Sequence, residues 1–133
     1  DSLAAIQGVA KGVVDNYEKS IAATVVHYIN DTISAYGADK FVFASLAKYW
    51  GEMKGYSLCH QFNPNGPMGG TANFEAYKAF QDLLGNAPVV PVVAEDDSFT
   101  NQADVDAYIA DLLSARDALQ AAFEFDATDV ENW

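Results

Sequence analysis

The most regular pattern of apolar and polar positions lies in the C-terminal third of the chain. Apolar residues recur there every three or four positions and alternate with aspartates, which is typical of an amphipathic helix; they are Val105, Ile109, Leu112, Leu113, Leu119 and Phe123. Thr100 or Asn101 can cap the first turn, and the acids near the start of the segment suit the helix dipole. The pattern therefore predicts a helix that begins just after Asn101.

A second apolar segment follows Gly37, with Asp39 as its expected N-cap. It runs toward Phe62 and is apolar on most of its circumference, so we expect a helix at the centre of a bundle; its apolar residues are Phe41, Val42, Phe43, Leu46, Tyr49, Trp50 and Met53. Gly51 and Gly55 each weaken such a helix by up to about 1 kcal/mol relative to alanine. Close approach of a neighbouring helix would compensate for this loss, and a local kink is the alternative.

Residues 2–36 also have a helical pattern, and their clearest apolar stripe consists of Ile21, Val25, Tyr28, Ile29 and Ile33. Asp15 followed by Glu18 resembles a capping box, which would end a short first helix near Val14 and begin a longer one. One continuous helix is the other interpretation, and the pattern leaves both open.

Proline- and glycine-rich segments divide the rest of the chain. Residues 63–70 contain two prolines and three glycines, which predicts a loop that ends the central helix. Thr71 can then cap a short helix that stops at Gly85; its apolar residues are Phe74, Tyr77, Phe80, Leu83 and Leu84. Residues 87–93 are apolar but contain two prolines, so we expect an extended crossover along the bundle. The fold class is therefore all-α: one domain over residues 1–133, with four to five helices and one long extended crossover.

Charge narrows the range of partners. The chain has 133 residues, is 50% hydrophobic and carries a formal net charge of −12. Residues 95–133 hold 11 acids against Arg116 alone. This balance disfavours nucleic acid, whose phosphates need clustered Lys and Arg, and no apolar run is long enough for a membrane span. We interpret the acidic third as a solvated face that maintains solubility, with attraction of cations or of a basic partner as the alternative. Its acids lack the spacing of an EF-hand loop.

Few side chains can carry chemistry. His27 and Asp31 lie four residues apart on one helical face, and Glu52 and His60 belong to the second helix; these four residues are the candidate metal ligands. The Glu-x-x-His pairs of di-iron bundles and the HExxH pattern are absent, so interface or surface histidines are the competing interpretation. Cys59 precedes His60 at about 100° around the helix, and adjacency alone therefore does not predict a catalytic thiolate.

Aromatic residues beside the predicted loop are candidates for ligand binding. Most of the seven Tyr, eight Phe and two Trp lie at core spacing, so packing is their default role. Trp50, Tyr56 and Phe62 come just before residues 63–70, and we expect them to form an exposed patch that binds a ligand.

Residues 48–56, Lys-Tyr-Trp-Gly-Glu-Met-Lys-Gly-Tyr, lead into Gln61-Phe62-Asn63-Pro64. This WxEMKG…QFNP segment resembles a signature of an uncharacterised family of secreted bacterial helical proteins that are distantly imelysin-like, and residues 27–31 are similar to that family too. The resemblance covers residues 15–125. It implies an extracytoplasmic helical bundle, in the periplasm, at the cell surface or secreted, with no established activity. Members of the family are longer, so the chain would correspond to a C-terminal portion or a trimmed product, which a start at Asp1 without a leader also fits. The Gly-x-His-x-x-Glu motif of imelysin-like proteins is absent, which argues against metallopeptidase chemistry.

The predicted function is therefore a non-catalytic extracytoplasmic domain that binds a protein or a small ligand. It uses no cofactor. The alternative is a metal- or iron-handling helical module that holds a divalent metal with His27, Asp31, Glu52 and His60.

Overall fold

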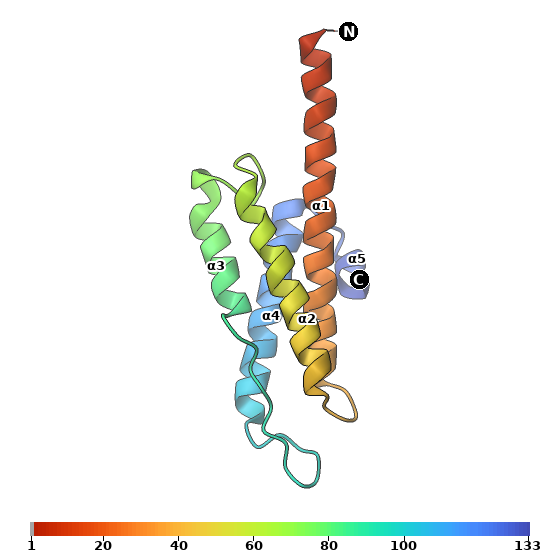
Figure 1. Cartoon of the computed structure of the whole chain (residues 1–133), viewed down its shortest axis with the longest axis vertical. Helices are drawn as coiled ribbons and strands as arrows, with labels where there is room; N and C mark the ends of the chain where they lie inside the picture. The colour runs from red at the N-terminus through yellow and green to blue at the C-terminus, as the bar shows by residue number, and fades with distance from the viewer. Residues whose placement is uncertain (1) are drawn as a thin grey trace.

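The computed structural model describes residues 2–133 and contains five α-helices and two short 3₁₀ helices in that range. They are α1 (Leu3–Tyr36), α2 (Phe43–Ser57), η1 (Leu58–Phe62), η2 (Thr71–Asn73), α3 (Phe74–Leu84), α4 (Gln102–Phe123) and α5 (Ala127–Asn132). The first four α-helices run up and down beside one another, and α5 lies against α1 (Figure 1). The predicted all-α bundle is confirmed. No helix in the described part of the chain is long and apolar enough to cross a membrane.

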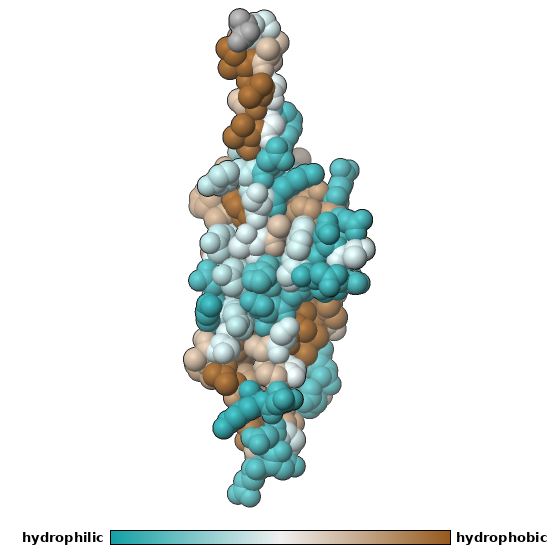
Figure 2. Space-filling view, turned by 90° about the vertical axis from the view of Figure 1, so that its right-hand side faces the viewer, coloured by the Kyte–Doolittle hydropathy of each residue, from teal (hydrophilic) through white to brown (hydrophobic). Residues whose placement is uncertain are grey.

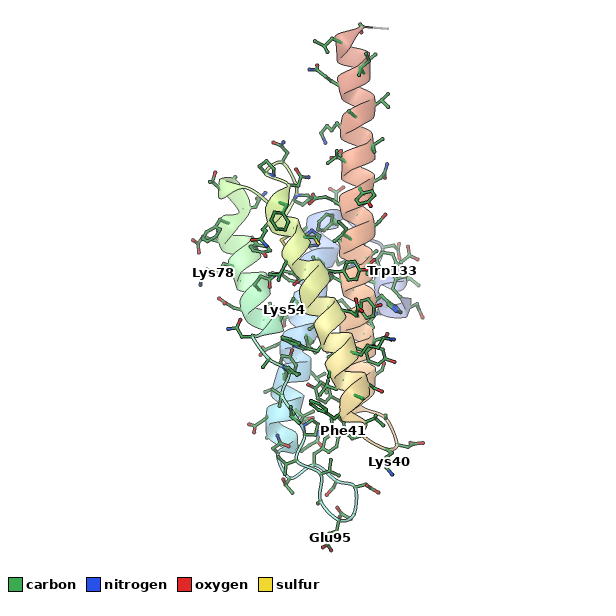
Figure 3. All side chains as sticks on the ribbon, in the orientation of Figure 1. Lys40, Phe41, Lys54, Lys78, Glu95 and Trp133 are labelled. Carbon is green, nitrogen blue, oxygen red and sulfur yellow. The ribbon has the colours of Figure 1, made fainter. Side chains whose placement is uncertain are left out.

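Helix α1 is continuous over 34 residues, so the interpretation with two helices is wrong. The Ser2 hydroxyl caps its start by accepting a hydrogen bond from the backbone N–H of Ala5 (3.3 Å). Asp15 pairs with Lys11 one turn earlier instead of capping a new helix. The second half of α1 packs in the bundle. The first half extends past the loop of residues 63–70, and its N-terminal part projects beyond the ends of the other helices (Figure 1 and Figure 3).

Helix α2 differs from its prediction. It begins after Val42 without a side-chain cap, so Asp39 is not the N-cap. Only Leu46, Met53 and Ser57 are buried along it, which makes α2 a peripheral helix rather than the central one. The error arises because its apolar residues are spread around the circumference and several of them, such as Phe43 (57% exposed), face solvent.

No neighbouring helix lies close to the two glycines of α2. A Cβ atom added at Gly51 or Gly55 would have no other atom within 4 Å outside its own helix backbone and chain neighbours. The expected compensation is therefore absent, and the glycines weaken α2 without a packing gain.

The core is built mainly from the packed half of α1 and from α4. The largest side chains that are almost fully buried are Phe80, Phe123, Ile29, Leu46, Met53, Leu84, Leu112 and Leu119. A chain of hydrogen bonds crosses this region: Trp50 Nε1 donates to Tyr108 Oη (2.8 Å), and Tyr108 Oη donates to the carbonyl of Leu84 (2.8 Å). These bonds join α2, the end of α3 and α4.

The segment between α3 and α4 is the extended crossover that the prolines predicted. The Tyr36 hydroxyl donates to the carbonyl of Val89 (2.8 Å) and fixes the crossover to the end of α1. Asn101 Oδ1 accepts from the backbone N–H of Val92 (2.8 Å), and Asn101 Nδ2 donates to the carbonyl of Val90 (3.2 Å). The Asn101 side chain therefore binds the crossover and makes no capping hydrogen bond to α4.

Helix α5 was not predicted. The Asp126 side chain caps it by accepting from a backbone N–H of the first turn (2.8 Å). Asn30 on α1 anchors it, since Asn30 Nδ2 donates to the carbonyls of Val130 and Trp133 (2.9 Å each). Arg116 Nη1 in turn donates to Asn30 Oδ1 (3.1 Å). Asn30 thus links the C-terminal helix to the bundle by hydrogen bonds, and the buried side chain of Val130 adds an apolar contact.

Candidate functional site

The four predicted metal ligands are not brought together. His27 Nε2 lies 3.4 Å from Asp31 Oδ2 on an outer side of α1, and both side chains are partly exposed. Glu52 is exposed on α2, whereas His60 is fully buried. Residues 2–133 contain no group of three or more His, Cys, Asp or Glu side chains that could hold a metal ion. The predicted four-residue site is therefore not assembled.

The three predicted ligand-binding aromatics have different surroundings. Trp50 is partly buried and donates to Tyr108 Oη, so it contributes to packing. Tyr56 stacks on Tyr28 with ring centroids 6.1 Å apart and is 40% exposed. Phe62, at the end of η1, is 77% exposed. Of the three, Phe62 offers the most surface to a partner.

A pocket of about 440 Å³ lies beside η1 and the start of α3. Its lining is Gln61, Met68, Gly69, Gly70, Thr71, Phe74 and Tyr77. Most of the lining is apolar, and the one titratable side chain in it is Tyr77, whose pKa is raised by burial. The pocket can accept an apolar side chain or a small ligand but holds no acid and base pair for a reaction.

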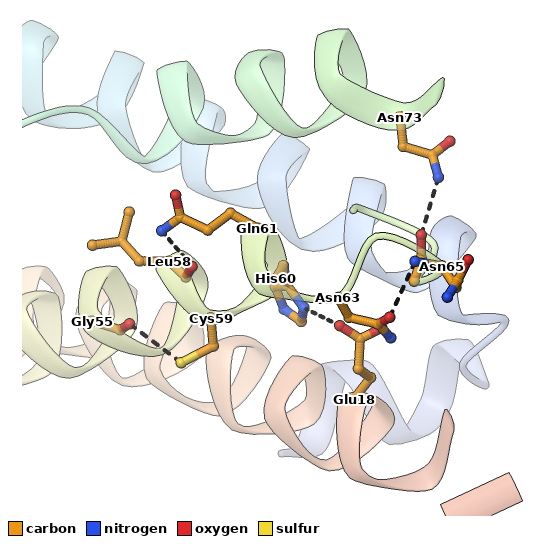
Figure 4. A network of polar contacts seen from close by, with 10 residues as sticks. Glu18, Gly55, Leu58, Cys59, His60, Gln61, Asn63, Asn65 and Asn73 are labelled. Atoms are coloured by element: carbon orange, nitrogen blue, oxygen red, sulfur yellow. Dashed lines mark hydrogen bonds and ion pairs between the residues drawn. The ribbon is translucent and has the colours of Figure 1, made fainter. Parts of the chain in front are cut away.

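A buried polar pair lies next to this loop. η1 turns His60 inward, where its ring packs on Phe123 with centroids 5.2 Å apart. His60 Nδ1 is 3.9 Å from Glu18 Oε1 (Figure 4). Burial lowers the pKa of His60 to about 4. Burial also raises the pKa of Glu18, more than the side-chain amide of Asn63 lowers it. The low-dielectric surroundings therefore disfavour charge on both groups.

The loop closes tightly over this pair. A Cβ atom at Gly66 would lie 2.0 Å from Glu18 Oε2, and Glu18 is only 7% exposed. Neither ring nitrogen of His60 has a hydrogen-bond partner among the described residues. His60 is fully buried, whereas the small exposed part of Glu18 lines a pocket together with Lys19 and Asn65. We interpret the pair as a polar element of the packing between α1, η1 and the loop. No local pattern predicts this pair, because Glu18 and His60 are far apart in the chain.

The largest exposed feature is a row of apolar side chains on the projecting half of α1. We call it the apolar face of α1; it consists of Leu3, Ile6, Val9, Val13, Val14 and Tyr17. Leu3 and Val9 are 70% exposed and Tyr17 is 72% exposed. Hydrophobic residues follow one another along this end of the molecule in Figure 2. These residues also recur every three or four positions in the sequence. The sequence-based prediction considered only the apolar stripe between Ile21 and Ile33, farther along the same helix.

The apolar face does not continue the side of α1 that packs in the bundle. The packed side includes Ala22, Val25 and Ile29. Steps of three or four residues back from these lead to Lys11 and Asp15, which are polar and exposed. At 100° per residue, most of the apolar face is turned by roughly 100° or more from the packed side, and Val14 lies nearest to that side. The bundle therefore cannot cover the apolar face by a simple shift of α1.

Charge also separates the projecting half from the bundle. Residues 2–17 contain Lys11 against Asp15, so their net charge is zero. Residues 18–133 contain 6 bases and 17 acids, a net charge of −11. The apolar face thus lies on a neutral segment of a strongly acidic chain.

No protein-family model, no curated protein and no solved structure matches this chain.

Proposed function

We propose that the chain is a non-catalytic extracytoplasmic binding domain whose contact surface is the apolar face of α1. The observation that carries this proposal is the exposure of six large apolar side chains in one row on a helix that projects from the bundle. Their exposed fractions correspond to a surface on the order of 600 Å², at the upper end of the largest apolar patches of monomeric proteins, which are often functional. Covering such a surface is favourable because it removes apolar area from water.

The remaining candidate sites favour binding over catalysis. In the His60 and Glu18 pair, the histidine is fully buried under the loop and offers no surface to a substrate. The pocket beside η1 is mostly apolar, which suits an anchoring side chain of a partner. The extracytoplasmic location is supported by the resemblance of residues 48–56 and 61–64 to secreted helical proteins.

Site-specific crosslinking tests the proposal. A photoreactive phenylalanine analogue in place of Val9 should form adducts with a partner in the producing cells, and Ile6→Gln with Val13→Gln should abolish them. The same analogue at Ala4, which is exposed on another side of the same segment, is the matched control. Equal yields from the two positions, or no adduct from Val9, would contradict the proposal. Digestion of the chain by protease added to intact producing cells would support the extracytoplasmic location.

A further inference from the structure

We propose that the partner of the apolar face of α1 is a second copy of this chain, bound antiparallel through the same face. This inference rests on the proposed function and names the partner of the same surface. A two-fold axis joins like to like, so one self-complementary face is enough to form a closed dimer.

The spacing of the residues fits a pairing helix. Leu3, Ile6, Ala10, Val13 and Tyr17 follow one another at intervals of three, four, three and four residues. This is the spacing of the a and d positions that meet in a coiled coil. Val9 and Val14 flank this line and widen the apolar surface.

The area is sufficient for a specific contact. With on the order of 600 Å² on each copy, pairing removes up to about 1,200 Å² from water in total, the lower end of the range for stable protein interfaces. Ordering losses and incomplete coverage reduce the resulting affinity. We therefore expect a reversible dimer that forms at micromolar concentrations.

Charge restricts pairing of copies to this segment and selects its direction. Two molecules with a net charge of −12 repel each other over most of their surfaces, but the projecting segments are neutral and can meet. A parallel pair would place the two bundles, each with a charge of −11, side by side. An antiparallel pair places them at opposite ends of about 15 shared residues, or about 22 Å. That separation is about twice the screening length of about 10 Å at 0.1 M salt.

Sedimentation equilibrium of the whole chain, from micromolar to millimolar concentration, tests the second copy as partner. We expect a monomer and dimer equilibrium for the unchanged chain. Ile6→Gln with Val13→Gln should weaken it at least a hundredfold, while Ala4→Gln, on another side of the same segment, should change it less than threefold. A chain that remains monomeric, or a dimer that the first double variant leaves intact, would overturn the proposal. Circular dichroism of the variants checks that the bundle is still folded.

Small-angle scattering of the dimer tests its direction. The antiparallel dimer should be much longer than the monomer, and its dissociation constant should change little between low and high salt. A dimer of nearly monomer length that added salt strengthens strongly would be parallel and would contradict the antiparallel arrangement. Failure of this inference is distinguishable from failure of the proposed function. If the chain is monomeric but still forms Val9 adducts with another protein, only the proposal of a second copy as partner is contradicted. If the chain is monomeric and forms no adducts, both proposals are contradicted.

Discussion

Replacing the buried histidine tests how the interior responds to protons. Burial lowers the pKa of His60 to about 4 in the folded chain, against an ordinary value of 6.5. The unfolded chain therefore binds a proton at His60 more readily than the folded chain does, and stability is lost as pH falls from 6.5 toward 4. Linkage gives about 2 kcal/mol of lost stability between pH 7.5 and pH 5 from this one group. The His60→Leu variant does not have this loss. The difference in free energy of unfolding between the variant and the parent chain should therefore shift by about 2 kcal/mol in favour of the variant when the pH is lowered from 7.5 to 5.

Urea unfolding followed by circular dichroism at both pH values measures the effect. The comparison of two differences cancels the packing cost of leucine, which is the same at each pH, and the titration of distant carboxylates. His27→Leu, which removes a half-exposed imidazole from α1, controls for the loss of an imidazole. If His60→Leu and the parent chain show the same pH dependence, burial does not control the proton affinity of His60.

Glu18 decides between burial and ion pairing as the dominant influence on His60. Its own raised pKa acts in the opposite direction, because the folded chain then holds the carboxyl proton more firmly and loses stability as pH rises above 4.5. Repeating the His60→Leu comparison in a Glu18→Gln chain removes this contribution. If instead protonated His60 forms a strong ion pair with Glu18 across 3.9 Å, the His60→Leu chain will lose stability at pH 5 relative to the parent chain, the reverse of our expectation.

Three further substitutions test the fold by thermal and urea unfolding. Gly51→Ala should stabilise α2 by up to about 1 kcal/mol, because the added methyl group meets open space; a destabilised variant would mean that a helix does approach there. Gly69→Ala should cost about 2 kcal/mol or more, since its Cβ would lie 1.7 Å from a backbone carbonyl oxygen of the same loop; a loss below about 0.5 kcal/mol would contradict this loop geometry. Asn101→Ala should cost about 1–2 kcal/mol by removing two hydrogen bonds to the crossover. It should also speed hydrogen exchange at Val92, and unchanged exchange there would mean that the asparagine does not hold the crossover.

Local patterns predicted the elements whose signals are local. The apolar spacing of α4 and α3, the stop at Gly85 and the extended crossover all depend on neighbours within a few residues, and they are observed. Gly85 adopts a φ of 73°, which glycine reaches without strain. Helix α5 escaped prediction because it has only six residues and its stability depends on Asn30, about 100 positions away in the chain. The predicted central position of α2 was wrong, because apolar residues spread around the circumference of a helix do not show which of them contact other helices.

The site was harder to predict than the fold, for the same reason. Burial lowers the pKa of His60. The residues that surround it, Phe123 on α4 and Glu18 on α1, are far from position 60 in the sequence. Trp50, expected at a binding surface, is instead tied to Tyr108 across the bundle. The identity of a residue suggested its chemistry, but only packing decided whether that chemistry faces inward or outward.

The apolar pattern of this face of α1 can be read from neighbouring residues, but its exposure depends on how the other helices pack. Residues 3–17 contain Gly8 and Gly12, which lower helix propensity, and a helix of that length is marginal in water by itself. The packed half of α1 supplies a template from which the helix extends, and a partner on the apolar face would supply the rest of its stability. Helical order in the projecting half and occupancy of its apolar face are therefore coupled. A contact that covers the face stabilises the helix that presents it, and each substitution that stiffens this segment lowers the ordering cost of binding.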